Sequence, residues 1–475
     1  MRPARYYPLF LSAMVADFLS GPKPFLQKVS VKVARKLQEG GFKLPDPVEI
    51  IARAGVPDTT SLQDLSDPIF PSVKRQLSDE ARVLYLVNSA QPYTVSGYTV
   101  RTQKLLRELS RKNVTVYPAT RVGYPATIGV VPTRDSVSVE SVNYFLLLPS
   151  RMSLRKDKNR RNAINLLVEL ARQLDITLLH TTTDFRNATL ISEVARILEI
   201  PWVYEVRGER DKTLEIENSG KEIKNFLAEF RRRETQAMQA ASAVLVLSEV
   251  SRRRVEERGV PKDKIYVVPN GFDRGEAVEA PTRDLAREKI GIPSSTKLIG
   301  TITSVVDYEG LDSLILALEF LDEDTQALIV GSGSALPALQ HLAEERGLAD
   351  RVVFAGKQDP QAIPVWCAAL DVFVLPRRDY EVCRAVTPLK PMLAMGMNIP
   401  VVASDLPAVR EATGGLALYV PPDDPEALSG AIRKVLVDPD HFYGHRLEAF
   451  LDTRTWQSSA ERLIEAYSET LSPDV

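Results

Sequence analysis

Short apolar runs alternate with amphipathic stretches along most of the chain after Arg82. A short apolar run is typical of a buried parallel strand, and an amphipathic stretch is typical of the helix that crosses to the next strand. In the first half the pattern predicts strands at 83–87, 114–117, 144–148, 176–179, 202–206, 244–247 and 265–268. It predicts a second series at 298–302, 327–330, 352–354, 372–375 and 400–403. The predicted fold class is therefore α/β, with two Rossmann-like, doubly wound sheets in succession.

A turn-rich segment, Pro269-Asn270-Gly271-Phe272-Asp273, separates the two series. We take it as the boundary between an N-terminal domain at 81–272 and a C-terminal domain at 273–455. A last helix at 456–475 could pack back on the first domain. Residues 1–80 have no strand pattern and contain Pro-bounded pieces, so we expect an N-terminal helical extension there. Two such domains create a central cleft lined by the carboxyl ends of the strands, where ligands bind.

Composition narrows the class of protein. The length of 475 residues exceeds what one hydrophobic core serves, and the net charge of -2 provides no overall field for nucleic acid. Cys367 and Cys383 stand in no metal-binding pattern, so we expect neither a disulfide nor a metal site, and a cytoplasmic location. The apolar stretch at 7–14 is too short to span a membrane, and we expect no signal peptide.

Two positions on the predicted rim of the first domain could carry chemistry. Gly97 opens the helix that runs to Arg111, where a glycine lets the backbone approach a ligand, although a tight turn alone could also require it. His180 directly follows the strand predicted at 176–179 and could position a sugar hydroxyl or shield positive charge. The alternative is a structural histidine, which is how we interpret His341, His441 and His445.

Arg207 ends the strand predicted at 202–206, and Gly208 follows it. Its guanidinium could reach across the cleft to a phosphate or carboxylate. The alternative is an ion pair with Glu205 inside the domain.

The stretch from Arg377 to Glu411 is predicted to form much of the donor side of the cleft. Arg384 and Lys390 flank the start of a helix expected to run to Met397, where free backbone N–H groups already suit an anion. Cations at this place would stabilise a departing nucleoside diphosphate. A solvated basic pair is the alternative.

Six basic residues and a single acid lie between Arg151 and Arg161. Such a run could contact anionic lipid head groups, and the apolar piece at 6–19 gives a second hint of surface binding. A solvated charged face is the commoner explanation of a charge run.

Together these motifs resemble the family 4 glycosyltransferases, retaining enzymes of the GT-B fold that move a sugar from a nucleotide-diphosphate donor to an acceptor. The resemblance runs from about Arg82 to the C-terminus. It is carried by the following segments: Ser96-Gly97-Tyr98, Thr120-Arg121-Val122-Gly123-Tyr124-Pro125, His180, Tyr204-Glu205-Val206-Arg207-Gly208, Val268-Pro269-Asn270-Gly271, Tyr308-Glu309-Gly310-Leu311-Asp312, and Thr387-Pro388-Leu389-Lys390-Pro391 through Asp405-Leu406-Pro407.

The resemblance implies roles for individual residues. It places the acceptor in the first domain and the nucleotide in the second, with base contacts from a loop after a middle strand, here 356–358, and it implies no metal. The predicted catalytic residues are His180, Arg207 and Lys390. The predicted donor-binding residues are Gly97, Ser304, Lys357, Arg384, Lys390 and Leu393. The predicted acceptor-binding residues are Tyr98, Arg101 and Arg121.

The chain departs from the family in two places. Ser304 and Glu309 stand where many members carry an Arg and a Lys for the donor phosphates, and an acid cannot replace a phosphate-binding lysine. Ala385 and Leu393 stand where the family has a pair of glutamates eight positions apart, the later of which binds the ribose. Neither side chain can accept a hydrogen bond from a ribose hydroxyl.

The sequence therefore predicts a metal-independent glycosyltransferase with a nucleotide-sugar as co-substrate and no other cofactor. Its product would be a surface polysaccharide or glycoconjugate, the acceptor a glycan or a lipid-linked sugar, and the protein cytoplasmic, possibly peripheral at the inner face of the membrane. A non-catalytic homologue acting as a binding or partner subunit is the main alternative. A nucleotide-sugar epimerase is a third, more distant interpretation.

Overall fold

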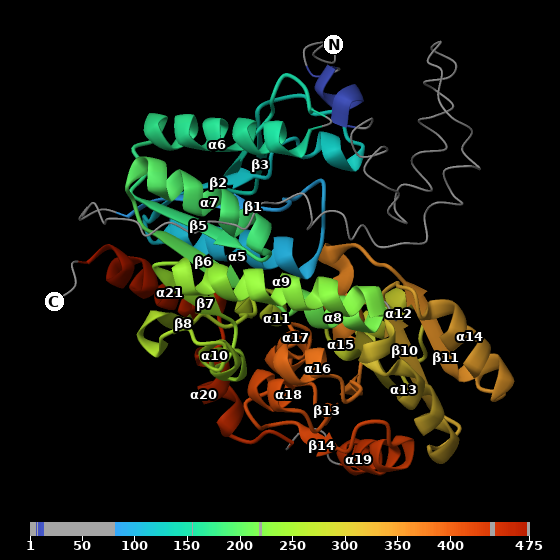
Figure 1. The fold of residues 1–475 in the computed structure, drawn as a ribbon. Helices are drawn as coiled ribbons and strands as arrows, with labels where there is room; N and C mark the ends of the chain where they lie inside the picture. Colours follow the sequence, from blue (N-terminus) through green and yellow to red (C-terminus); the bar gives the residue numbers. More distant parts are fainter. Residues whose placement is uncertain are drawn as a thin grey trace, which may run out of the picture. The chain divides into compact units, whose positions relative to one another are not determined.

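The computed structural model describes residue 6 and residues 8–13, 81–153, 155–217, 221–437 and 442–472. The chain divides into two compact units. The first unit contains Met1–Leu245, Glu256–Tyr266 and Leu463–Val475, and the second contains Val246–Val255 and Val267–Arg462. Figure 1 traces the described elements of both units along the chain.

The sheet of the first unit has the strand order β3-β4-β2-β1-β5-β6-β7-β8. The ladders that join β4, β2, β1, β5 and β6 are parallel, and β3 runs antiparallel to β4. The strands are β1 (Arg82–Val87), β2 (Thr115–Thr120), β3 (Ser136–Val139), β4 (Val142–Leu146), β5 (Leu178–Thr182), β6 (Trp202–Val206), β7 (Ala243–Val246) and β8 (Ile265–Val267).

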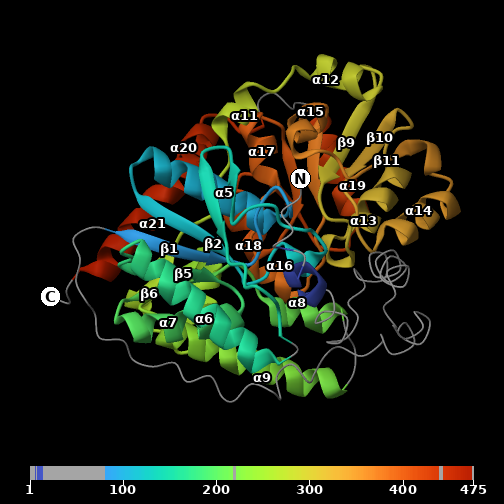
Figure 2. The same ribbon diagram turned by 90° about the horizontal axis from the view of Figure 1, so that it is seen from above.

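Helices cover both faces of this sheet (Figures 1 and 2). On one face lie α6 (Lys156–Gln173), α7 (Phe185–Leu198) and α9 (Lys221–Ala240), and on the other lie α5 (Gly97–Arg111) and the end of α21 (Trp456–Leu471). Helix α5 begins at a capping box, in which the Ser96 hydroxyl accepts from the Thr99 N–H and the Thr99 side chain accepts from the Ser96 N–H. Its leucines face the sheet, so the cap fixes where the helix starts and burial fixes its rotation.

The sheet of the second unit is parallel throughout, in the order β11-β10-β9-β12-β13-β14. Its strands are β9 (Lys297–Ile302), β10 (Thr325–Val330), β11 (Val352–Gly356), β12 (Val372–Leu375), β13 (Val401–Ser404) and β14 (Leu418–Val420). One hydrophobic core lies under α13 (Leu311–Ala317), α14 (Leu336–Glu345) and α19 (Pro425–Val437), and a second lies under α12 (Arg283–Ile290), α15 (Ile363–Ala368) and α17 (Pro391–Gly396). The predicted α/β class with two Rossmann-like sheets is confirmed.

Every predicted strand overlaps an observed one, and two strands were not predicted. The strands β3 and β14 are short and mostly half-exposed, so neither produces a clear apolar run. The prediction for β5 was set too early: the strand runs from Leu178 to Thr182, which places His180 inside the strand and not past its end. The buried threonines at its end are polar residues that the apolar pattern could not assign to a strand.

A short helical segment at residues 8–13 packs on the first unit. Leu9 and Ala13 form a buried cluster with Ala126, and the Ser12 hydroxyl accepts a hydrogen bond of 2.8 Å from the Met152 N–H. These apolar side chains are therefore used inside the protein, which removes the hint of surface binding for this segment. Apart from Tyr6, the rest of the predicted extension at 1–80 lies outside the described residues, and so does His441.

A buried glutamate joins α9 to the start of α7. Glu234 accepts hydrogen bonds from the Phe185 N–H at the first turn of α7 and from the Tyr204 hydroxyl at 2.7 Å. Burial and, to a lesser extent, the Asp184 charge raise the pKa of Glu234 to about 7, against the hydrogen bonds from Tyr204 and Phe185 that lower it. The carboxyl group is thus held by neutral donors, and no residue within the described ranges forms an ion pair with it.

We predict that Glu234→Gln stabilises the protein at pH 8. Because the folded pKa of about 7 lies above the ordinary value of 4.5, the contribution of Glu234 is fully present below about pH 4.5 and is lost as the pH rises through 7. A shift of this size corresponds to about 3 kcal/mol between the two limits. The free energy of unfolding from urea titrations at pH 5 and pH 8 measures the difference.

Glu229 on the same helix is the matched control. Hydrogen bonds from Arg232 and Arg233 lower its pKa to about 2, so its contribution has the opposite sign and is lost as the pH falls below the ordinary value. Glu229→Gln should not remove the loss of stability that ionised Glu234 causes at pH 8. A Glu234→Gln variant with the same pH dependence as the wild type would contradict the prediction.

Candidate functional site

The strand order of the second sheet reverses between β9 and β12. Strands β10 and β11 follow on one side of β9, and β13 and β14 follow on the other side of β12. Ligands of doubly wound sheets bind in the crevice at the carboxyl edge where the order reverses. The loops that leave β9 and β12 therefore frame the candidate site of this unit.

Three charged side chains meet in this crevice. The buried Glu309 carboxylate accepts hydrogen bonds from Arg377 Nη2 at 2.9 Å and Arg377 Nε at 3.2 Å, and Lys390 Nζ lies 3.5 Å from Glu309 Oε1. The Lys390 ammonium also donates to the Thr303 hydroxyl. Burial alone would raise the pKa of Glu309, but Arg377 and Lys390 outweigh it and hold that pKa at about 2. The cluster carries one net positive charge.

The two loops approach each other too closely for an added side chain. Gly310 has φ of +64°, and a Cβ atom there would lie 2.0 Å from the carbonyl oxygen of Pro376. Only glycine tolerates both this backbone conformation and this approach. The glycine lets the Glu309 carboxylate reach Arg377 on the opposite loop.

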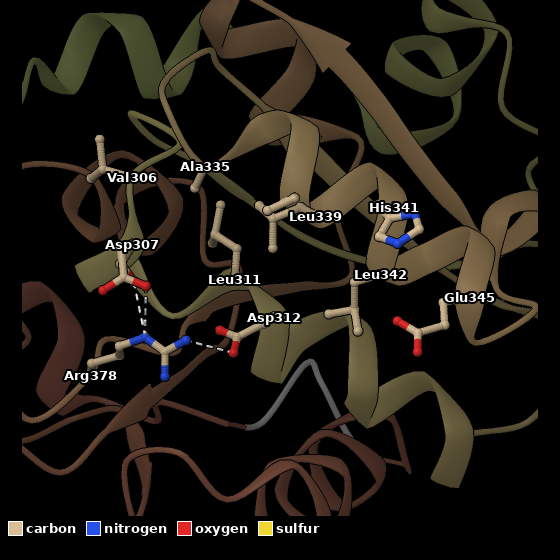
Figure 3. Close-up of a pocket in the computed structure, with 11 residues that line it drawn as sticks. Val306, Asp307, Leu311, Asp312, Ala335, Leu339, His341, Leu342, Glu345 and Arg378 are labelled. Atoms are coloured by element: carbon tan, nitrogen blue, oxygen red, sulfur yellow. Dashed lines mark hydrogen bonds and ion pairs between the residues drawn. The ribbon is translucent and has the colours of Figure 1, made fainter.

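Next to this cluster is a hollow of about 310 Å³ between α13 and α14. Its wall is apolar at Leu311, Leu339 and Leu342, and Figure 3 shows the Arg378 guanidinium between Asp307 and Asp312 at one end. Arg378 donates to Asp312 and to Asp423 at 2.6 Å each. Three aspartates surround one arginine, so this end of the crevice repels anions.

The other predicted donor residues of this unit differ in exposure and in their partners. Ser304 is exposed, and Lys357 is exposed on the loop after β11, which is the third strand of this unit along the chain and an edge strand of its sheet. Arg384 is exposed and forms an ion pair with Asp379. For Arg384 this agrees with the alternative of a solvated charge. Leu393 is half-buried against the hydrophobic core.

Lys390 itself is the N-cap residue of α17, which begins at Pro391 and ends at Gly396. The helix is shorter than the predicted span from Pro388 to Met397.

In the first unit, Glu205 is the centre of a buried ionic network. Its carboxylate accepts from Arg101 Nε at 2.8 Å and from Arg207 Nε at 2.7 Å, and the Tyr85 hydroxyl donates to it at 2.5 Å. Arg207 also donates to the Tyr98 carbonyl oxygen at 2.9 Å and the Thr102 hydroxyl at 2.8 Å, and it contacts the Tyr85 hydroxyl. The alternative of an ion pair within the domain is the one observed, and Arg207 has no donor left for a phosphate.

His180 is buried next to this ionic network, beside Tyr85 and Glu205. Its ring stacks on Tyr85 at a centroid distance of 3.8 Å, and its Nδ1 shares a hydrogen bond of 2.7 Å with the Tyr467 hydroxyl of α21. Burial lowers its pKa to about 3, with Glu205 opposing and the arginines assisting, so the ring is neutral. His180 has 1% of its surface exposed, and its Nε2 has no hydrogen-bond partner among the described residues. Its burial and its bond to Tyr467 favour the alternative of a structural histidine.

The remaining predicted residues of this unit divide by exposure. Gly97 and Tyr98 are exposed at the start of α5, Arg121 is half-buried at the end of β2, and Arg101 is buried against Glu205. The sequence interpretation missed Arg377 as a partner in the second unit and Tyr85 in the first. The signal for Arg377 was its position shortly after a buried strand. Nothing in the sequence indicates that a tyrosine inside β1 takes part in a polar network.

Comparisons with known proteins agree with this geometry. A model of the Glycosyl transferase 4-like domain matches residues 96–271, and a model of Glycosyl transferases group 1 matches residues 296–438. D-inositol 3-phosphate glycosyltransferase of Xylanimonas cellulosilytica is 28% identical over 256 residues, which cover 48% of this chain and 58% of that protein. Alpha-monoglucosyldiacylglycerol synthase of Streptococcus pneumoniae is 22% identical over 79% of this chain and 83% of that protein.

Solved structures extend the likeness in fold. Sucrose-phosphate synthase from Thermosynechococcus elongatus matches with a TM-score of 0.64 at 18% identity, covering 82% of this chain and 98% of that one. HepE of Anabaena, in complex with UDP and glucose, matches with a TM-score of 0.63 at 17% identity, covering 82% and 100%.

Both matched regions indicate one family, and the two sheets agree with it. The two family models together cover the strand–helix series of each unit, in the order that the motifs of the sequence indicate. The chain is a member of the family 4 glycosyltransferases, with the GT-B fold class.

Proposed function

We propose that this protein transfers a sugar from a nucleotide-diphosphate donor to an acceptor with retention of configuration. The observation that carries the proposal is Lys390, a cation at the carboxyl edge of the second sheet where the strand order reverses. Its neighbour Arg377 adds a second positive charge. The solved relative from Anabaena holds UDP and glucose, and a nucleotide-sugar is the co-substrate that this crevice would take.

Charge compensation is the chemistry that the crevice supplies. As the bond to the sugar breaks, negative charge grows on the departing phosphate, and a fixed cation stabilises that charge more in the transition state than before it. In the proposed reaction the acceptor hydroxyl attacks on the leaving-group face, and the departing phosphate takes the hydroxyl proton. No metal and no side-chain base is part of this proposal. His180, being neutral and buried, is left out of it.

Glu309 weakens the proposed donor site. Its carboxylate lies 3.5 Å from Lys390 Nζ, so the lysine is already partly neutralised before a phosphate arrives. A phosphate bound at Lys390 would also lie near the negative charge of Glu309. In a buried site this repulsion is strong. We therefore expect weak donor binding.

A catalytically weak or inactive binding subunit is the second candidate. Glu309 at the phosphate side, Leu393 in the core and the buried His180 all favour it. The two candidates differ in one observable. An enzyme releases nucleoside diphosphate from at least one nucleotide-sugar when an acceptor is supplied, and a binding subunit releases none.

We propose that the acceptor is lipid-linked or a glycan of the cell surface, and that the protein works in the cytoplasm, peripheral at the membrane. The relative from Streptococcus pneumoniae is an alpha-monoglucosyldiacylglycerol synthase. In this chain, Arg151, Arg155, Lys156, Lys158 and Arg161 are exposed around the start of α6. Asp157, the one acid in the run, is shared by Arg155 at 2.9 Å and Arg161 at 3.6 Å, which leaves a positive surface. Among the described residues, no helix has the length and apolar character needed to cross a membrane.

The donor site predicts opposite effects of two substitutions. Lys390→Ala should weaken binding of the matching nucleotide-sugar at least tenfold, because it removes the half-buried cation of the site. Glu309→Gln should strengthen it roughly tenfold, because it removes the competing charge while keeping a hydrogen-bond acceptor for Arg377. Isothermal titration with UDP-, GDP- and ADP-glucose and UDP-N-acetylglucosamine measures both.

Arg384→Ala, which removes an exposed cation paired with Asp379, serves as the control and should leave the affinity unchanged. Equal affinity in the Lys390 and Glu309 variants would reject the donor site. Binding without release of diphosphate, in the presence of a range of acceptors, would decide for the subunit.

The basic surface predicts binding to anionic vesicles. The full chain should sediment with vesicles of phosphatidylcholine and phosphatidylglycerol at 3:1, and less so as the salt concentration rises. Replacing Lys156, Lys158 and Arg161 by serine should reduce binding at least tenfold, since each cation near an anionic surface contributes about 1 kcal/mol.

The control for this experiment changes three exposed cations of the second unit, Arg283, Lys297 and Arg346, to serine. It alters the net charge by the same amount. If this control loses vesicle binding as strongly as the α6 variant, net charge and not the α6 surface is responsible.

A further inference from the structure

The hollow between α13 and α14 has no part in the proposed transfer reaction. Its lining includes neither Glu309 nor Lys390, so it is distinct from the proposed donor site. Its volume of about 310 Å³ lies at the small end of the range for pockets that bind small molecules. A stable protein interface usually covers about 800 Å² on each partner, so a small ligand suits this hollow better than a protein does.

The floor of the hollow is apolar. The buried Leu311 and Leu339 belong to the hydrophobic core under these helices, and the half-buried Leu342 extends the same surface along α14. In Figure 3 the side chains of Leu311 and Leu339 lie together in the middle of the hollow. Methylene groups of a ligand that covered this floor would leave water, which favours binding.

Carboxylates stand at both ends of this apolar floor. Figure 3 shows Asp307 and Asp312 beside Arg378 at one end and Glu345 at the other. Glu345 is the last residue of α14, which has 10 residues and is therefore about 15 Å long. The hollow thus has an elongated shape with negative groups at its two ends.

The negative charge at the first end exceeds the positive charge. Arg378 donates to one oxygen of Asp312 and to one oxygen of Asp423, at 2.6 Å each, and its Nε lies 3.5 Å from Asp307 Oδ1. One guanidinium therefore serves three carboxylates. The second oxygen of Asp312 can accept a hydrogen bond from a ligand, because a carboxylate accepts at both oxygens.

The carboxylate at the second end is also available to a ligand. Within the described ranges, no residue forms an ion pair with Glu345. The next residue along the chain, Arg346, is paired with Glu319 at 3.2 Å. A cation bound at Glu345 would therefore displace no existing partner.

We propose that this hollow binds an alkyl diamine, a small molecule with two ammonium groups joined by a methylene chain. One ammonium group donates to Asp312, the methylene chain covers Leu311 and Leu339, and the second ammonium group reaches Glu345. The linear polyamines are the chemical class with this pattern. An anionic ligand would meet carboxylates at either end, and an uncharged alkyl chain would leave them without a partner.

Saturation-transfer difference NMR on the full chain at pH 7.5 tests the proposal. The probes are 1,7-diaminoheptane, 1-aminoheptane and 1,7-heptanediol, which differ in charge and share the same chain. The diamine should bind about fivefold or more tightly than the monoamine, because it meets carboxylates at both ends, and the diol should receive no saturation. At constant ionic strength, MgCl₂ at the concentration of the diamine should not displace it, because Mg²⁺ has no apolar chain.

Two neighbouring glutamates of α14 provide a matched pair of variants. Glu345→Gln should weaken binding of the diamine roughly threefold or more, because it removes the carboxylate at the second end. Glu344→Gln makes the same change of charge at an exposed residue that does not line the hollow, and should leave binding unchanged. Ala338→Phe places a ring in the hollow from an exposed position and should abolish binding. Melting temperatures equal to that of the wild type show that the variants are folded.

Three results would overturn the proposal. They are equal affinity for the diamine and the monoamine, displacement of the diamine by MgCl₂, and equal effects of the Glu344 and Glu345 variants. Diamine binding that is lost selectively in Glu345→Gln supports it. The experiment contains no nucleotide-sugar, so its outcome does not depend on whether the protein transfers a sugar.

Discussion

Each unit keeps a glutamate buried at the carboxyl edge of its sheet, and a carboxylate in that place requires cations within hydrogen-bond distance. Glu205 is compensated by Arg101 and Arg207, and Glu309 by Arg377 and Lys390. Breaking such a pair typically costs 3–5 kcal/mol, because it leaves a charge buried without a partner. The cations at both edges are therefore committed first to the fold. Only what remains after this compensation, chiefly the part of Lys390 that is still exposed, is available to a ligand.

Because these cations first compensate the buried glutamates, the contacts observed differ from the roles assigned from the sequence. A sequence shows that Arg207 follows a strand and that His180 stands near the end of one, and both facts suggest a rim that meets substrate. It does not show that Tyr85 lies opposite His180 in the register. In the structure the histidine ring is buried and stacks on Tyr85. Glu205 and Arg207 stand two positions apart, the spacing that puts two side chains on the same face, and this was the available sign of their pairing.

The architecture itself was accessible from the apolar runs, because strands that are covered on both faces have little choice of residue. The strands β9, β10, β12 and β13 follow this rule closely. The strands β3 and β14 were missed since they are short and half-exposed, and the end of β5 was missed since Thr181 and Thr182 are buried polar residues. Lys390 could be found because a helix start after a Pro-rich turn is legible in sequence. Its contact with Glu309 could not, because that contact depends on how closely the loops after β9 and β12 approach at Gly310.

The close approach at Gly310 also constrains how this chain could have diverged from its family. A lysine at position 309, as many family members carry, would stand beside Arg377 and Lys390 with no carboxylate among them. Three cations crowded into one buried crevice would repel each other until an anion arrived. A return to the family pattern at 309 alone would thus destabilise the empty protein, and so would a loss of Arg377 alone. A change at position 309 should therefore be tolerated better when residue 377 changes with it, because the acid and the arginine compensate each other's charge.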